Sequence, residues 1–318
     1  MRTLWKWLPD SVDRRVRFFA WASLVSQILI IGTGGAVRLT GSGLGCPTWP
    51  RCTEESFVTT PEMGFHGIIE FGNRLLTFVL IVIAIVMFAM VVKLRTQRPE
   101  LLRLSVALGL GIPGQAVIGG VTVLTDLNPY VVGLHYLLSA VLVGLAAWLL
   151  YRVRVGPATK VTMAPGGFRA LSIAAVFSLT VSILMGIVTT GSGPHAGDGG
   201  AARNGLNSEL LQHVHAWPSY LTGGIALALA VWAWRSATLS SRARRAGAGA
   251  LAVTLAQIGI GLYQARNGLP ELFVGIHMVL ASVLVAVFVT LVLATRADAI
   301  TREEEGQSRQ REKVGSDS

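Results

Sequence analysis

The sequence predicts an all-α integral membrane protein of eight transmembrane helices, arranged as two parallel, pseudo-symmetric four-helix bundles. Three observations support this: an apolar composition, eight long apolar stretches, and an internal repeat. Of the 318 residues, 52% are hydrophobic and 14% are charged. The mean hydropathy of +0.58 is well above that of a soluble domain of this length. Lipid is therefore the expected main solvent of the chain.

The eight apolar stretches are each long enough to cross a hydrocarbon core of about 30 Å. They cover residues 16–38, 65–92, 104–124, 131–151, 170–190, 208–234, 246–265 and 272–295. The third and the seventh are rich in glycine, which suits close helix packing in lipid. The first is too long for the apolar region of a signal peptide, and no small-residue cleavage site follows it. We therefore count it as a span.

The basic residues predict the orientation of these spans. Nearly all of the 27 lysines and arginines fall in the N-terminal tail, the even-numbered connections or the C-terminal tail. The exceptions are Arg38, Arg51, Arg74, Arg203 and Arg266. The positive-inside rule then places both termini in the cytoplasm, in a plasma-membrane protein. The net charge of +10 follows from this distribution, so we expect no nucleic-acid partner.

A repeat relates the two halves of the chain. One constant offset pairs Gln115 with Gln257, Gly119 with Gly261, His135 with His277, Glu70 with Gln212, and Asn73 with His215. Each half contains four spans, so both insert in the same direction and are expected to be related by an axis along the membrane normal. The predicted organisation is a cytoplasmic tail (1–15), an N-terminal half (16–152), a cytoplasmic linker (153–169), a C-terminal half (170–295) and a disordered cytoplasmic tail (296–318).

Four histidines lie near the outer ends of even-numbered spans: His66, His135, His215 and His277. Polar groups at this depth are costly unless they are paired or coordinated. Heme iron needs only one or two axial ligands from facing helices. We therefore predict that His215 and His277 hold one porphyrin, with interhelical hydrogen bonding as the alternative. His213 cannot share a helix face with His215, so we expect it to meet headgroups or a heme propionate.

The N-terminal half departs from this pattern, because Asn73 stands where the other half has a histidine. His66, Glu70 and Asn73 follow an i, i+4, i+7 spacing and form one stripe. His66 is expected either to act as a displaced iron ligand or to transfer protons beside Glu70. A carboxylate at this depth is a candidate for a catalytic or heme-positioning role. The alternative for Glu70 is an ion pair with Arg74.

Two outer loops carry further candidates. The two cysteines, Cys46 and Cys52, lie in the first outer loop, where oxidation to a disulfide is expected. Free thiols, or a pair that cycles its redox state, are the alternatives. In the third outer loop we expect His195, together with Arg203, to contact heme propionates. A hydrated turn is the alternative there.

Three segments resemble the heme A synthase family, in a bacterial, actinobacterial-like form. They are GAVRLTGSGLGCPTWPRC (35–52), EFGNR (70–74) and TGSGPHAGD (190–198). The resemblance extends over residues 18–295. It implies an eight-helix enzyme that oxidises the C8 methyl group of heme O to the formyl group of heme A.

The resemblance also assigns expected roles to individual residues. It implies a heme b on His215 and His277, and a substrate heme O held by His135. Glu70 is the acidic residue that turnover would require, and the family's outer-loop cysteines match Cys46 and Cys52. Expected heme or propionate contacts are Arg38, Asn73, Arg74, His195 and His213. Most members have a histidine at the position of Asn73.

The mechanism that we hypothesise is successive oxidation of the methyl group, with oxygen from water. Electrons would leave through heme b to a quinone or another acceptor. Heme O synthase and terminal oxidase assembly factors are the expected partners, beside the lipid bilayer. The alternatives are a two-heme b-type membrane electron-transfer protein and a heme transporter.

Overall fold

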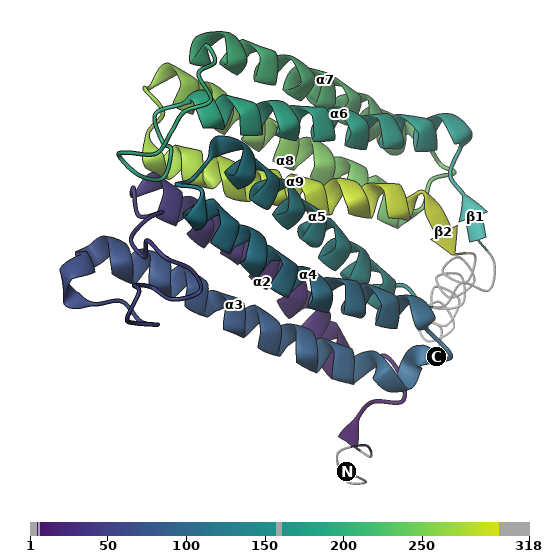
Figure 1. Ribbon diagram of the computed structural model, residues 1–318. Helices are drawn as coiled ribbons and strands as arrows, with labels where there is room; N and C mark the ends of the chain where they lie inside the picture. Colours follow the sequence, from purple (N-terminus) through teal and green to yellow (C-terminus); the bar gives the residue numbers. More distant parts are fainter. Residues whose placement is uncertain (1–4, 6, 157–160, 299–318) are drawn as a thin grey trace, which may run out of the picture.

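The computed structural model describes the chain except for residues 1–4, 6, 157–160 and 299–318 (Figure 1). Eight described helices are long and apolar enough to cross a membrane, which confirms the predicted number of spans. They are α2 (Arg14–Leu39), α3 (Gly64–Val91), α4 (Pro99–Leu124), α5 (Pro129–Arg154), α6 (Gly166–Ser192), α7 (Ser208–Arg235), α8 (Ser241–Arg266) and α9 (Glu271–Ala294). Short 3-10 turns, η1 (Pro61–Met63) and η2 (Val92–Arg95), flank α3.

Most helices extend a few residues beyond the predicted apolar stretches, and four of them begin with a side-chain cap. The side chains of Asp13, Asn128, Asn207 and Ser240 accept backbone N–H groups at the starts of α2, α5, α7 and α8. Such caps satisfy donors that have no partner within the helix. Hydropathy finds the observed start of α7 at Ser208, but it places the starts of α4 and α8 five residues too late, because charged residues such as Glu100 and Arg242 lie in their first turns.

Each half of the chain closes into a ring of four helices with its own buried apolar core. In the first ring α2, α3, α4 and α5 pack in order and α5 returns to α2; in the second, α6 to α9 do the same. Figure 1 shows the first ring in the lower part of the view and the second above it. Helix α9 packs against both α2 and α5, and α5 also contacts α6. The pseudo-symmetry axis along the membrane normal stays a prediction.

The surface and the helix ends suit a membrane bundle. Large apolar side chains such as Phe78, Phe177 and Trp234 are exposed on the outside of the helices, where lipid would cover them. Helix α2 begins and α9 ends at the same end of the bundle (Figure 1). An even number of spans requires this arrangement. The chain is thus a multi-pass membrane protein.

One short strand pair departs from an all-helical chain. Strand β1 (Val161–Met163) pairs antiparallel with β2 (Arg296–Asp298). A further hydrogen bond from the Ala164 N–H to the Thr295 carbonyl, 2.8 Å, extends the pairing. The strands fall in the predicted linker and at the start of the tail that we expected to be disordered. Residues 299–318 of that tail lie outside the described residues.

Candidate functional site

In the C-terminal half, two histidines predicted to be a pair face each other. His215 on α7 and His277 on α9 have ring centroids 6.2 Å apart, with the ring planes at 78°. Nδ1 of His215 lies 2.9 Å from the Ser182 backbone carbonyl. A carbonyl only accepts, so Nδ1 carries the proton and Nε2 is left with a free lone pair. His215 is therefore in the tautomer that binds a metal through Nε2.

The spacing of these two imidazoles is compatible with an iron atom bound between them. Imidazole nitrogens bind metals at about 2 Å, and the 6.2 Å centroid separation leaves space for one metal atom between two rings turned toward it. Nδ1 of His277 is buried and has no hydrogen-bond partner among the described residues. Such unpaired polar atoms are rare in folded proteins and call for an explanation. A bound group that orients the His277 ring would be one such explanation.

The N-terminal half presents one histidine at the equivalent place. Nδ1 of His135 on α5 is also buried and unpaired within the described part of the chain. Gln115 donates to the His135 carbonyl at 3.1 Å, and Gln257 donates to the His277 carbonyl at 3.1 Å. The residues that the repeat aligns thus make equivalent contacts. Gln115 also donates to the Ser139 hydroxyl at 2.6 Å.

Across the first ring from His135, α3 carries Asn73. Its side-chain oxygen accepts a hydrogen bond from the Thr33 hydroxyl of α2 at 2.8 Å. Among the described residues no hydrogen bond or ring contact joins Asn73 to His135. The first ring therefore offers one imidazole, opposite a side chain already bound to a neighbouring helix.

Glu70 lies one turn before Asn73 and is only 5% exposed. Its Oε2 accepts the Cys46 N–H at 2.6 Å, and its Oε1 accepts Nε of Arg74 at 3.1 Å, with a second contact from Nη2 of the same guanidinium. The ion pair with Arg74, our alternative for Glu70, is thus present. Removing one partner of a buried ion pair costs about 3–5 kcal/mol.

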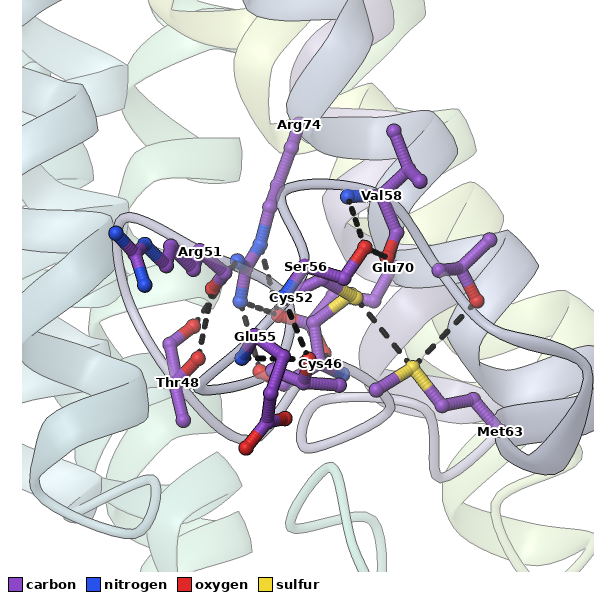
Figure 2. Close-up of a disulfide and its surroundings, with 12 residues drawn as sticks. Cys46, Thr48, Arg51, Cys52, Glu55, Ser56, Val58, Met63, Glu70 and Arg74 are labelled. Carbon is purple, nitrogen blue, oxygen red and sulfur yellow. Dashed lines mark hydrogen bonds and ion pairs between the residues drawn. A yellow bond between two sulfur atoms is a disulfide. The ribbon is translucent and has the colours of Figure 1, made fainter.

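The first outer loop is closed by the predicted disulfide between Cys46 and Cys52, with Cα atoms 4.4 Å apart. Figure 2 shows Arg74 reaching into this loop from α3. Its guanidinium donates to the carbonyls of Cys46 (2.8 Å), Thr48 (3.0 Å) and Arg51 (3.1 Å). Glu70 and Arg74 together therefore fix the backbone of the disulfide loop.

The same loop places Trp49 against the helix that faces His135. A Cβ atom on Gly120 of α4 would overlap the Trp49 indole. The preceding residue, Gly119, faces the His135 ring. Trp49 thus closes the outer side of the first ring next to its histidine, and the repeat has Leu262 at the position of Gly120.

His66 lies at the exposed start of α3. Its Nδ1 is 2.8 Å from the hydroxyl of the buried Ser42. It lines a pocket of about 600 Å³ with residues of the first and third outer loops, among them Leu44 and Asp198. No hydrogen bond joins His66 to Glu70 in the described structure, because Glu70 binds the disulfide loop instead.

Three residues that were predicted to contact heme propionates bind backbone carbonyls in this structure: Arg38, His195 and Arg203. Arg38 of α2 donates to the backbone carbonyls of His195 (2.6 Å) and Thr190 (3.0 Å). The His195 ring lies 2.9 Å from the Leu269 carbonyl through Nε2. Arg203 donates to the Pro194 carbonyl at 2.6 Å. His213 is exposed on α7.

Sequence reasoning missed three residues of these sites: Ser182, Gly186 and Trp49. Ser182 acts through its backbone carbonyl, which no side-chain pattern reveals. Gly186 faces His215 as Gly119 faces His135, but a change in loop length breaks the constant offset here. Trp49 was visible only as part of the Cys46–Cys52 motif. The TGSG segments at the ends of α2 and α6 pair Gly186 with Ala36, so the repeat does not single out Gly186.

The fold and the site define a class: multi-pass membrane proteins of two four-helix rings with histidines facing the ring interiors near one end. The model of the COX15-CtaA family, described as cytochrome oxidase assembly protein, matches residues 17–289. The chain belongs to this family.

Three bacterial proteins named heme A synthase are similar to the chain. That of Geobacillus thermodenitrificans is 29% identical over 48% of this chain and 49% of the relative. That of Geobacillus kaustophilus strain HTA426 is 30% identical over 44% and 43%. That of Lysinibacillus sphaericus strain C3-41 is 29% identical over 45% and 46%. The matched part thus spans about half the length of these curated relatives.

Proposed function

We propose that the protein is a heme A synthase, a membrane oxidoreductase that converts the C8 methyl group of heme O to the formyl group of heme A. One observation carries the proposal: two repeat-related sites differ in their ligands, with His215 facing His277 in one ring and Asn73 across from His135 in the other. The first suits a resident heme and the second a heme that enters and leaves. Membership of a family of cytochrome oxidase assembly proteins and the relatives named heme A synthase support it.

In this proposal the C-terminal half holds heme b. His215 and His277 would hold its iron, and the bond from Nδ1 of His215 to the Ser182 carbonyl leaves Nε2 as the nitrogen that would bind it. When bound, a heme at this place would supply an electron acceptor for the reaction and a path to a quinone or another acceptor. The protein supplies the two imidazoles and an apolar surrounding, both of which tune a heme potential.

The N-terminal half holds heme O as substrate, with His135 as the ligand of its iron. His66 serves at the outer entrance of this half, where it lines the pocket shared by both outer loops. Arg38, Asn73, Arg74, His195 and His213 are proposed to contact hemes or propionates. Each cation among them can offer N–H donors to a carboxylate after exchanging a backbone carbonyl partner.

The reaction converts a methyl group and one water molecule to a formyl group, and it releases four electrons and four protons. It passes through a hydroxymethyl group and a gem-diol, which loses water. Glu70 is proposed as the proton acceptor for the attacking water. Its carboxylate is held in one position by Cys46 and Arg74, and a positioned base within a dry site is effective.

The orientation follows from the same assignment. Both termini lie in the cytoplasm, and the histidine ends of the helices with the disulfide loop lie on the outer side of the plasma membrane. Heme O synthase supplies the substrate, and oxidase assembly factors receive the product. A heme transporter would need its halves to rock against each other. The bonds from Arg38 to the third outer loop argue against such movement.

The test is the heme content and heme identity of protein expressed with a heme O synthase. Extraction followed by mass measurement is expected to find heme A and a hydroxylated intermediate. Heme without either product would support the two-heme electron-transfer alternative and contradict the enzyme. In parallel, His277→Ala is expected to abolish the b-type spectrum, whereas Leu272→Ala, at an exposed position of the same helix, retains it.

A further inference from the structure

We propose that Gly119, Gly186 and Gly261 are positioning residues: each is a seat against which one heme-ligating imidazole is held. The seated rings are His135, His215 and His277, in that order. This inference rests on the proposed function, because it concerns how the protein orients the ligands of its two hemes. It adds residues that lie on the helices opposite those ligands.

The three contacts share one geometry. A Cβ atom added at Gly186 would lie 3.0 Å from Cε1 of His215. At Gly261 it would lie 3.1 Å from Cε1 of His277, and at Gly119 it would lie 3.2 Å from Cε1 of His135. In each case Cε1 is the nearest atom, so each ring turns the same edge toward its glycine. All three distances are shorter than ordinary van der Waals contact.

This glycine contact occurs at each of the three histidines that face into a four-helix ring, and it is absent at the fourth equivalent place, where no histidine stands. Each glycine lies on the span that precedes its histidine: α4 before α5, α6 before α7, and α8 before α9. At the fourth equivalent place α3 carries Asn73, and α2 meets it with the Thr33 hydroxyl. The α2 glycines Gly32 and Gly35 face Val279 and Met278 of α9 instead.

A second contact lies one helical turn before each glycine. The Ser182 carbonyl accepts Nδ1 of His215, four residues before Gly186. Gln115 and Gln257, four residues before the other two glycines, donate to the backbone carbonyls of His135 and His277. The preceding helix thus contacts each histidine at two points. The glycine limits how near the ring lies, and the residue one turn earlier binds the ring of His215 or the backbone of His135 and His277.

The physical reason for glycine is close approach, since only a residue without Cβ leaves this space. An alanine would push the ring away by a few tenths of an ångström and tilt the ligating nitrogen. Changes in the residues that orient a metal-bound histidine cost about 10–100-fold in affinity or activity. These glycine contacts therefore determine the affinity of each half for its heme.

The test compares alanine at a seat with alanine at a glycine of the same helix that faces open space. Gly261→Ala is matched by Gly259→Ala on α8, and Gly119→Ala by Gly114→Ala on α4, since a Cβ at either control meets no atom within 4 Å. Purified protein is measured for heme b per chain, low-spin electron paramagnetic resonance, the heme midpoint potential, and kinetics of heme O conversion.

We expect Gly261→Ala to lower retained heme b at least tenfold, or to shift its resonance and potential, while Gly259→Ala matches the wild type. We expect Gly119→Ala to keep the b-type signature and raise the KM for heme O about tenfold, while Gly114→Ala does not. This selectivity between halves separates positioning from a general folding defect, which would affect both readouts together.

Three results overturn the inference. One is a Gly261→Ala protein with the heme content, resonance and potential of Gly259→Ala. Another is an equal loss of both readouts in both seat variants, which would make the glycines packing residues only. A wild-type protein without any heme would overturn the proposed function itself, and it is recognised before any variant is made.

Discussion

The two rings share a scaffold and differ in what they place at its centre. The second ring has His215 facing His277, with no disulfide loop at its outer end. The first has His135 alone, with Asn73 bound to Thr33 and an outer loop fixed by Glu70 and Arg74. In the proposed function, the comparison teaches that the same four-helix frame would retain a heme where it supplies two imidazoles, and would exchange one where it supplies a single imidazole and a carboxylate.

The substitution with the largest expected effect on the difference between the two rings is Glu70→Gln, because the second ring has Gln212 at this position. A glutamine retains an oxygen that accepts the Cys46 N–H but removes the basic carboxylate. We expect conversion of heme O to fall at least about 100-fold, in the range of a lost general base, with the b-type spectrum intact. The ratio of heme A to heme O, read by mass measurement, checks this.

The exposed Glu55 of the disulfide loop supplies the control for that experiment, since Glu55→Gln changes the same charge without a contact to α3. It is expected to retain full conversion. Normal conversion by Glu70→Gln would show that the role of Glu70 ends with holding the loop.

The reciprocal exchange, His215→Asn, gives the second ring the residue of the first. Asparagine is a poor iron ligand, so one axial bond is lost. We expect heme b per purified chain to drop about tenfold, measured by the pyridine hemochrome spectrum. Glu209→Asn, at an exposed position in the first turn of the same helix, is the control and should retain the heme. Equal heme in both variants would refute the axial role of His215.

Asn73→His gives the first ring a second imidazole across from His135. We expect bound heme to rise about twofold per chain, because the substrate site then retains its heme, and product release to slow. The same hemochrome measurement, with conversion assayed alongside, checks both effects. Unchanged heme content would mean that the Asn73 position does not point at the substrate iron.

The smallest expected effect concerns the packing of Trp49 against Gly120 at the end of the first four-helix ring. Gly120→Ala would displace Trp49, and overpacking of this kind costs about 1–3 kcal/mol. The apparent Tm of the detergent-solubilised protein should fall by several degrees. Gly114→Ala on the same helix meets no neighbour and should leave the Tm unchanged. Indistinguishable melting curves would place Trp49 outside the packed closure.

Much of the fold was predictable from the sequence. Hydropathy finds the eight spans because each must be apolar along its whole length, and the two cysteines of one short loop do form a disulfide. The strand pair at 161–163 and 296–298 was not predictable, because three-residue strands carry no periodic signal.

The site was predictable in its residue types but only partly in its contacts. The repeat aligned Gln115 with Gln257 and Gly119 with Gly261, yet it gave no reason for either pair. Arg38 was expected at a propionate, and here its guanidinium binds the backbone carbonyls of Thr190, at the end of α6, and of His195, in the loop that follows. A sequence reveals side chains far better than it reveals which carbonyl a long side chain will reach.

The packing of α5 against α9 has a consequence for electron flow. These two helices carry His135 and His277 respectively, and they touch directly across the seam between the rings. Neighbouring helix axes lie about 8–10 Å apart. In the proposed function, an electron taken from heme O in the first ring would cross only these two packed helices to reach the second ring. Under the same proposal, this packing would remove the need for a diffusing electron carrier between the two sites.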